Sequence, residues 1–92
     1  MDAANKKGIK VINCPAHNAY AVAEYTIGLI LNELRNISRA CTALKKGEWR
    51  EKYLNSETLT EVRSQTIGVI GFGTIGRLVI ERLKGFQPTI LV

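Results

Sequence analysis

Apolar residues recur at steps of three and four along the middle of the chain, the spacing that places side chains on one helix face. These positions are Val22, Tyr25, Leu29, Ile30, Leu34, Ile37, Cys41 and Leu44. Asn18 suits the N-cap, Lys45 and Lys46 suit the negative end of the helix dipole, and Gly47 suits the C′ position. The pattern predicts one helix of about 25 residues from Asn18 to Lys46, roughly 40 Å long. Such a length is typical of a helix that bridges lobes or subunits.

The segments around this helix carry weaker signals. Residues 2–7 read as the end of a helix, with Gly8 at its C′ position. Residues 10–13 read as a short strand that Pro15 closes, because proline cannot continue a ladder of hydrogen bonds. Residues 48–64 are polar and predict a connection that follows the surface. Its expected apolar anchors are Trp49, Tyr53, Leu54 and Leu59.

Residues 66–92 have the order of a βαβ unit. A short apolar run leads into a glycine-rich turn, a helical stretch follows, and residues 89–92 form a second apolar run. The expected buried stripe of the helix is Ile75, Leu78, Val79 and Leu83. Gly85 is expected to end this helix. Two strands joined by a helix indicate an α/β fold with a parallel sheet.

The turn between the first strand and the helix has the spacing G-x-G-x-x-G, which in this position is typical of dinucleotide binding. Gly71 would make the tight turn, Gly73 would let a pyrophosphate approach the backbone, and Gly76 would let the helix pack on the strand. Amide groups at the helix start and the positive end of its dipole would hold the phosphates. The other interpretation is a glycine-rich turn without a ligand. The candidate cofactor-binding residues are Gly71, Phe72, Gly73, Thr74, Ile75 and Gly76.

The second half of a dinucleotide site is not visible in the sequence. An Asp or Glu about 20 residues past the glycines normally holds the adenosine ribose. That position falls just beyond Val92, and the only aspartate of the chain is Asp2. NAD is the expected cofactor, and NADP is not excluded.

Composition narrows the remaining classes. The chain has 92 residues, with 13 Lys and Arg against 8 Asp and Glu, which gives a formal charge of +5. The charges are scattered without interleaved aromatics or zinc spacing, so we expect neither a nucleic-acid partner nor a metal. Cys14 and Cys41 lack a paired motif, which favours a reducing, cytoplasmic setting, and Cys41 is expected in the core. The longest apolar stretch, residues 27–31, is too short to span a membrane.

Three motifs together resemble one family. Residues 8–24 run from Gly8-Ile-Lys-Val-Ile-Asn through Cys14-Pro-Ala-His-Asn-Ala to Tyr20-Ala-Val-Ala-Glu. Residues 46–49 follow with Lys-Gly-Glu-Trp, and residues 66–76 contain the glycine motif. In order and spacing they are similar to the D-isomer-specific 2-hydroxyacid dehydrogenases, including the D-3-phosphoglycerate dehydrogenase-like members. Ala16, Tyr25 and Ser64-Gln65 depart from the usual family residues.

The resemblance implies an architecture and an activity. Residues 1–16 would be the tail of the substrate lobe, and residues 17–92 the N-terminal part of the NAD-binding domain. Within that part, residues 17–46 would be the crossing helix between lobes and residues 66–92 the first βαβ unit of a partial Rossmann fold, a doubly wound parallel sheet. The parent would be an NAD-dependent oxidoreductase that transfers a hydride between nicotinamide and C2 of a D-2-hydroxy acid or 2-keto acid, acting as a homodimer.

The resemblance also implies that the catalytic Arg, Glu and His lie beyond Val92, so the 92 residues are expected to be an inactive fragment that supplies the pyrophosphate loop. His17, the only histidine, is expected to be a helix-entry residue, and Glu24 to make structural hydrogen bonds. Arg77 is expected either near the phosphates or in solvent. The alternative function is a non-catalytic NAD(H)-sensing or interaction protein of the same fold.

Overall fold

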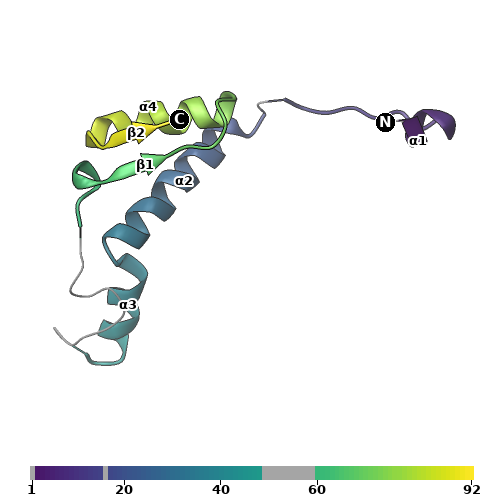
Figure 1. The fold of residues 1–92 in the computed structure, drawn as a ribbon. Helices are drawn as coiled ribbons and strands as arrows, with labels where there is room; N and C mark the ends of the chain where they lie inside the picture. Colours follow the sequence, from purple (N-terminus) through teal and green to yellow (C-terminus); the bar gives the residue numbers. More distant parts are fainter. Residues whose placement is uncertain (1, 16, 49–59) are drawn as a thin grey trace.

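The computed structural model describes residues 2–15, 17–48 and 60–92. It has two parts: a βαβ unit preceded by two helices, one of which packs against it, and an extended N-terminal arm (Figure 1). The arm begins with helix α1 (Asp2–Lys6) and continues without regular structure to residue 15. Gly8 has φ +71° and ends α1 as predicted, and the Ile9 amide returns to the Ala4 carbonyl at 2.9 Å.

Residues 10–13 do not form the predicted strand. Val11 and Ile12 lie exposed along the arm, and the pairing in the described residues joins only the two strands of the βαβ unit. A strand needs a neighbour to satisfy its backbone groups. The local sequence is extended, as its apolar pattern indicates, but it lies away from the sheet.

The predicted long helix is two helices with a sharp junction. Helix α2 runs over Ala19–Leu34 and helix α3 over Ile37–Lys45. Between them Asn36 takes the left-handed conformation (φ 54°, ψ 34°), which asparagine tolerates better than most residues. Its side chain is almost fully buried, with 1% exposure. The prediction of one continuous helix was therefore wrong, because repeated apolar spacing does not reveal a single left-handed residue.

Side chains fix this junction, which we call the elbow. The Ser38 amide and hydroxyl both donate to Asn32 Oδ1, at 2.8 and 2.9 Å. Arg39 donates to Asn36 Oδ1 at 2.9 Å and to both carboxylate oxygens of Glu33 at 3.0 and 3.1 Å. The Ser38 amide is one of the backbone N–H groups that the start of α3 leaves without a helical partner, and the other bonds join side chains of α2, α3 and the residue between them.

The elbow also changes which residues of α3 are covered. Cys41 is exposed, so its predicted place in the core was wrong. In Figure 1 α3 extends beyond the sheet and α4, whereas α2 packs against α4. At the far end of α3, Gly47 has φ +78° and the Glu48 amide returns to the Ala43 carbonyl at 2.9 Å, which confirms the predicted C′ glycine.

The predicted connection over residues 48–64 lies mostly outside the described residues, including its expected anchors at 49–59. Where the description resumes, the short 3₁₀ helix η1 (Val62–Ser64) leads into strand β1 (Thr66–Gly68). Val62 is buried in the core, so η1 places an apolar anchor just before the sheet.

The βαβ unit forms as predicted. Strand β1 leads through the glycine turn into helix α4 (Thr74–Leu83), and strand β2 (Thr89–Leu91) pairs with β1 in parallel. Ile67 pairs with Ile90, and both pack on the core. Gly85 does not end the helical path, because 3₁₀ helix η2 (Lys84–Phe86) continues α4 and the left-handed residue is Gln87, with φ 62°.

One small core joins these elements. Its buried members come from α2, η1 and α4, and α2 packs against α4. Leu83 is 1% exposed at the centre. The buried residues of the cluster are Ala23, Val62, Val79 and Leu83, and those packed around it are Ile27, Ile30, Leu31, Leu34, Ile67, Leu78 and Ile90.

The start of α4 lies against the end of β1 through two glycines. Gly71 has φ +98°, a backbone conformation that residues other than glycine rarely adopt, and the chain reverses its direction there. A Cβ on Gly76 would lie 2.8 Å from the Gly71 carbonyl oxygen and 3.7 Å from Val69 Cγ1. The predicted structural roles of Gly71 and Gly76 are confirmed, because the turn and the helix approach as closely as backbone atoms allow.

We predict that Gly76→Ala destabilises the βαβ unit. The added methyl would force the Gly71 carbonyl to move, and overpacking of this kind costs about 1–3 kcal/mol. Hydrogen exchange at the α4 amides should accelerate accordingly. Gly85→Ala is the matched control, because a Cβ there meets nothing within 4 Å. Equal exchange rates in the two variants would contradict the close contact.

We also predict that the 92-residue chain is partly disordered or self-associates. Its radius of gyration is 19.2 Å, against about 12 Å for a compact chain of this length. Leu29, Ile37 and Leu44 are each slightly more than half exposed, so each forgoes about 1 kcal/mol, roughly half of the free energy of full burial. Leu34, also expected to be exposed, is partly covered by the core. Sedimentation combined with thermal melting tests this, and a sharp cooperative transition at the monomer mass would contradict it.

Candidate functional site

The candidate site is the loop between β1 and α4, where a backbone turn meets a helix N-terminus. Gly73 occupies the N-cap position of α4. The first helical bond in this turn joins the Arg77 amide to the Gly73 carbonyl at 3.0 Å. The amides of Thr74, Ile75 and Gly76 come before that bond, so the helix offers them no carbonyl partner. These amides and the positive dipole end make a surface suited to an anion.

Gly73 differs from the other two motif glycines. Its φ of −87° and ψ of −165° are open to any residue. A Cβ on it would meet no protein atom within 4 Å. Neither backbone conformation nor packing within the described chain therefore requires glycine here. What a side chain at Gly73 would occupy is the open space in front of the helix N-terminus.

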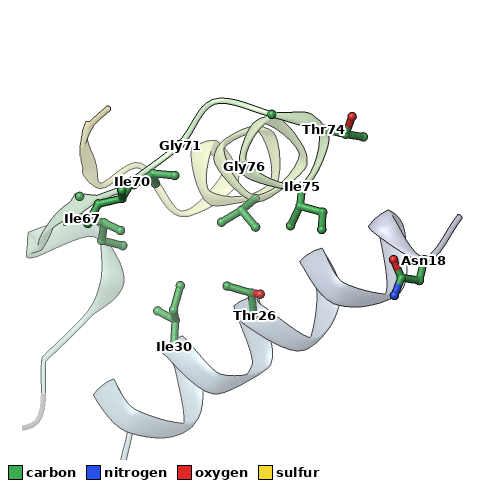
Figure 2. A pocket seen from close by; sticks show the side chains of 13 residues that line it. Asn18, Thr26, Ile30, Ile67, Ile70, Gly71, Thr74, Ile75 and Gly76 are labelled. Atoms are coloured by element: carbon green, nitrogen blue, oxygen red, sulfur yellow. The ribbon is translucent and has the colours of Figure 1, made fainter. Parts of the chain in front are cut away.

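A groove of about 580 Å³ extends from this loop along α2. Figure 2 shows Thr26 and Ile30 reaching from α2 toward the strand and loop, and Ile75 reaching toward α2. Thr74 points away from them. The residues that line the groove are Asn18, Thr26, Ile30, Ile67, Gly68, Val69, Ile70, Gly71, Gly73, Thr74, Ile75, Gly76 and Val79.

The groove lining is apolar with few polar side chains. The Thr26 hydroxyl donates to the Val22 carbonyl at 2.7 Å, within its own helix. Asn18 stands at the N-cap of α2 as predicted, but its side chain makes no capping hydrogen bond there. No acid, base or thiol is among the lining residues. The part of the groove formed by described residues can therefore bind a ligand, but it contributes no acid, base or thiol that could move a proton.

Phe72 and Arg77 form a contact that the sequence did not reveal. The Arg77 guanidinium carbon lies 4.7 Å from the centroid of the Phe72 ring, within the range of a cation–π interaction. Five positions separate the two residues, and one precedes the helix while the other is in it. Helical spacing rules cover residues inside one helix, so they do not predict this pair.

The other candidate residues lie apart from this loop or take no part in a cluster. His17 is exposed in a turn before α2, which agrees with the helix-entry interpretation, and Glu24 is exposed on α2. Cys14 is exposed on the arm. Within the described ranges, no three His, Cys, Asp or Glu residues gather as metal ligands would. None of the helices described is both long and apolar enough to cross a membrane.

Comparison with known proteins identifies the domain. Residues 27–92 match the family model "D-isomer specific 2-hydroxyacid dehydrogenase, NAD binding domain". D-3-phosphoglycerate dehydrogenase of Methanocaldococcus jannaschii is 43% identical over 91 residues, which are 99% of this chain and 17% of that protein. Hydroxypyruvate reductase of Thermotoga maritima is 43% identical over 88 residues, which are 96% of this chain and 28% of that protein.

Solved structures share the fold. The apo-structure of D-lactate dehydrogenase from Escherichia coli superposes with a TM-score of 0.74 at 37% identity. The match covers 95% of this chain and 27% of that one. The chain thus spans less than a third of the length of the relatives that it matches. With the parallel βαβ unit and its glycine turn, these matches place the chain in the family of D-isomer-specific 2-hydroxyacid dehydrogenases, with residues 27–92 in the NAD-binding domain of that family.

Proposed function

We propose that the loop from Gly71 to Gly76 binds the pyrophosphate of NAD. The carrying observation is the open space at Gly73, which lies beside amides that lack helical partners. A phosphate that fills this space could accept hydrogen bonds from the amides of Thr74, Ile75 and Gly76. Phe72 lies within this loop and is the remaining one of the six candidate cofactor-binding residues from Gly71 to Gly76. Membership in an NAD-binding domain family supports a dinucleotide over other anions.

We further propose that the whole protein transfers a hydride between nicotinamide and C2 of a D-2-hydroxy acid or the matching 2-keto acid. Three relatives support this class by name, as a phosphoglycerate dehydrogenase, a hydroxypyruvate reductase and a lactate dehydrogenase. The cofactor supplies the hydride chemistry, while these residues bind and orient its diphosphate. The groups that bind substrate and move the proton would belong to parts of the protein outside residues 1–92.

The division of the chain and its assembly are parts of the same proposal. Residues 1–16 would belong to the substrate lobe and residues 17–92 to the NAD-binding domain, with α2, the elbow and α3 crossing between lobes. The exposed apolar residues of α2 and α3 favour a homodimer. Two free cysteines, Cys14 and Cys41, favour a cytoplasmic location.

A second candidate function is NAD(H) sensing or protein interaction without catalysis. The groove favours it in one respect, because its lining contains no acid–base group. A catalytic protein must then bring such groups from elsewhere in its chain, whereas a sensor needs none. The enzyme hypothesis would be favoured over the sensor hypothesis if the longer protein has Arg, Glu and His at the catalytic positions of the family.

We predict that Gly73→Val weakens dinucleotide binding at least tenfold, a loss of about 1.4 kcal/mol. The measurement uses a chimera in which this chain replaces the matching 91 residues of the M. jannaschii relative, with NADH affinity determined by titration. The valine would occupy the space that the phosphate needs. Gly85→Ala is the control, since it lies outside the loop and meets no neighbour within 4 Å. Unchanged affinity in a folded Gly73→Val chimera would remove the loop from the cofactor site.

We predict that the 92-residue chain alone catalyses no hydride transfer with any 2-keto acid. Its only histidine, His17, is exposed in a turn before α2, and no acid, base or thiol is among the described residues that line the groove. Nicotinamide absorbance at matched protein and substrate concentrations is the measurement, with the chimera as the active control. Turnover above the buffer rate would show that the catalytic groups are among these 92 residues.

A further inference from the structure

We propose that Arg77 contacts the diphosphate of the bound dinucleotide, and that Phe72 is a positioning residue that holds its guanidinium at the loop. The inference rests on the proposed function of the loop and adds to it a charged side chain from α4. The amides of Thr74 to Gly76 would bind one side of the diphosphate. The Arg77 guanidinium would neutralise part of its charge.

The first argument is the direction of the side chain. Arg77 is the fourth residue of α4, and helical side chains lean toward the N-terminus of their helix. The Arg77 side chain follows this rule, because its guanidinium reaches a ring that belongs to the loop before the helix. The 4.7 Å distance from the guanidinium carbon to the Phe72 ring places the charge at a loop residue that lies between Gly71 and Gly73 in the sequence.

The second argument is which part of the guanidinium the contact uses. Stacking on Phe72 occupies its flat face and leaves the N–H donors along its edge for acceptors in the plane. Arg82 on the same helix is different, because it stacks on Tyr20 and also donates to the Leu78 carbonyl at 3.2 Å. In the part of the chain that the structure describes, the Arg77 side chain has the ring contact alone. Its donors therefore have no other partner among the described residues, and the side chain reaches the loop before α4.

The third argument is electrostatic. A cation near a helix N-terminus lies at the positive end of the dipole, where it is disfavoured unless an anion joins it. Other ion pairs of the described residues are local, Arg39 with Glu33 and Arg63 with Glu61. No described carboxylate pairs with Arg77. The cation–π contact with Phe72 offsets part of the unfavourable electrostatic energy of the Arg77 guanidinium at this position. A bound diphosphate would make that energy favourable.

Phe72 is suited to the positioning role. It is 54% exposed and lies between the first two glycines of the motif, so one side of its ring is open to stack with a guanidinium. Its rigid ring restricts a long side chain that would otherwise sample many rotamers, and the entropy cost of binding falls as a result. Leucine at this position would keep apolar bulk and lose the attraction for a cation.

The test is titration of the ¹⁵N-labelled 92-residue chain with ADP and, separately, with adenosine, followed by NMR at the loop amides and at Arg77 Nε. The variants are Arg77→Gln, Arg77→Lys and Phe72→Leu. Arg63→Gln is the matched control, because it removes the same charge from an exposed side chain at the opposite end of β1. Cofactor KM of the same variants in the chimera is the second measurement, which does not depend on how well the short chain folds.

We expect Arg77→Gln to weaken ADP binding about fivefold, the effect of about 1 kcal/mol, and to leave adenosine binding unchanged. Phe72→Leu should move the Arg77 Nε resonance by loss of the ring current and weaken ADP binding about twofold. Arg77→Lys should fall between wild type and Arg77→Gln. Added salt should reduce ADP affinity less in Arg77→Gln than in wild type.

Two results would overturn the inference in distinguishable ways. If Arg77→Gln behaves like Arg63→Gln while ADP still shifts the loop amides, Arg77 is a solvated helix residue and the proposed pyrophosphate loop stands. If ADP shifts no loop amide in the wild-type chain and cofactor KM in the chimera is insensitive to Gly73, the loop assignment and the inference fail together. A loss of adenosine binding equal to the loss of ADP binding would also reject a phosphate contact.

Discussion

The close contact between Gly71 and Gly76 sets the geometry on which the rest of the unit depends. With a Cβ at Gly76 only 2.8 Å from the Gly71 carbonyl oxygen, no other residue fits without displacing the turn. This contact brings the N-terminus of α4 against the end of β1. It thereby fixes the direction of the dipole, the position of the free amides and the line along which α4 meets α2. The close contact between Gly71 and Gly76 therefore supports both the anion-binding surface at the start of α4 and the core between α4 and α2.

The sequence predicted what local spacing encodes. The turn at Gly71, the close packing at Gly76, the two strands of the βαβ unit and the C′ positions of Gly8 and Gly47 each depend on residues close together in the chain, and the structure confirms them. The family assignment followed from three such local motifs, and the family-model match confirms it. The phosphate contacts of Gly73 and its neighbours remain predictions.

The wrong predictions share a cause. The spacing of apolar residues indicates which local structure a segment favours, but it does not show which other segment that structure packs against. Residues 10–13 form no strand, and Cys41 is exposed on α3, which extends beyond the sheet and α4 (Figure 1). The elbow itself depends on Asn32, Glu33 and Arg39, whose polar contacts cross between two helices. Such contacts form only once the chain has turned. The stacking of Arg77 on Phe72 was missed for the same reason.

The elbow has a mechanical consequence. A continuous helix is a stiff rod, and turning one end would carry the packed end with it. Here one residue in a left-handed conformation joins α2, which is held by the core, to α3, which lies beyond it (Figure 1). Helix α3 is about 13 Å long, so a dihedral change of about 20° at Asn36 would swing its far end by about 4–5 Å. Such a swing would reorient the outer surface of the molecule while the contact between α2 and α4 stays in place.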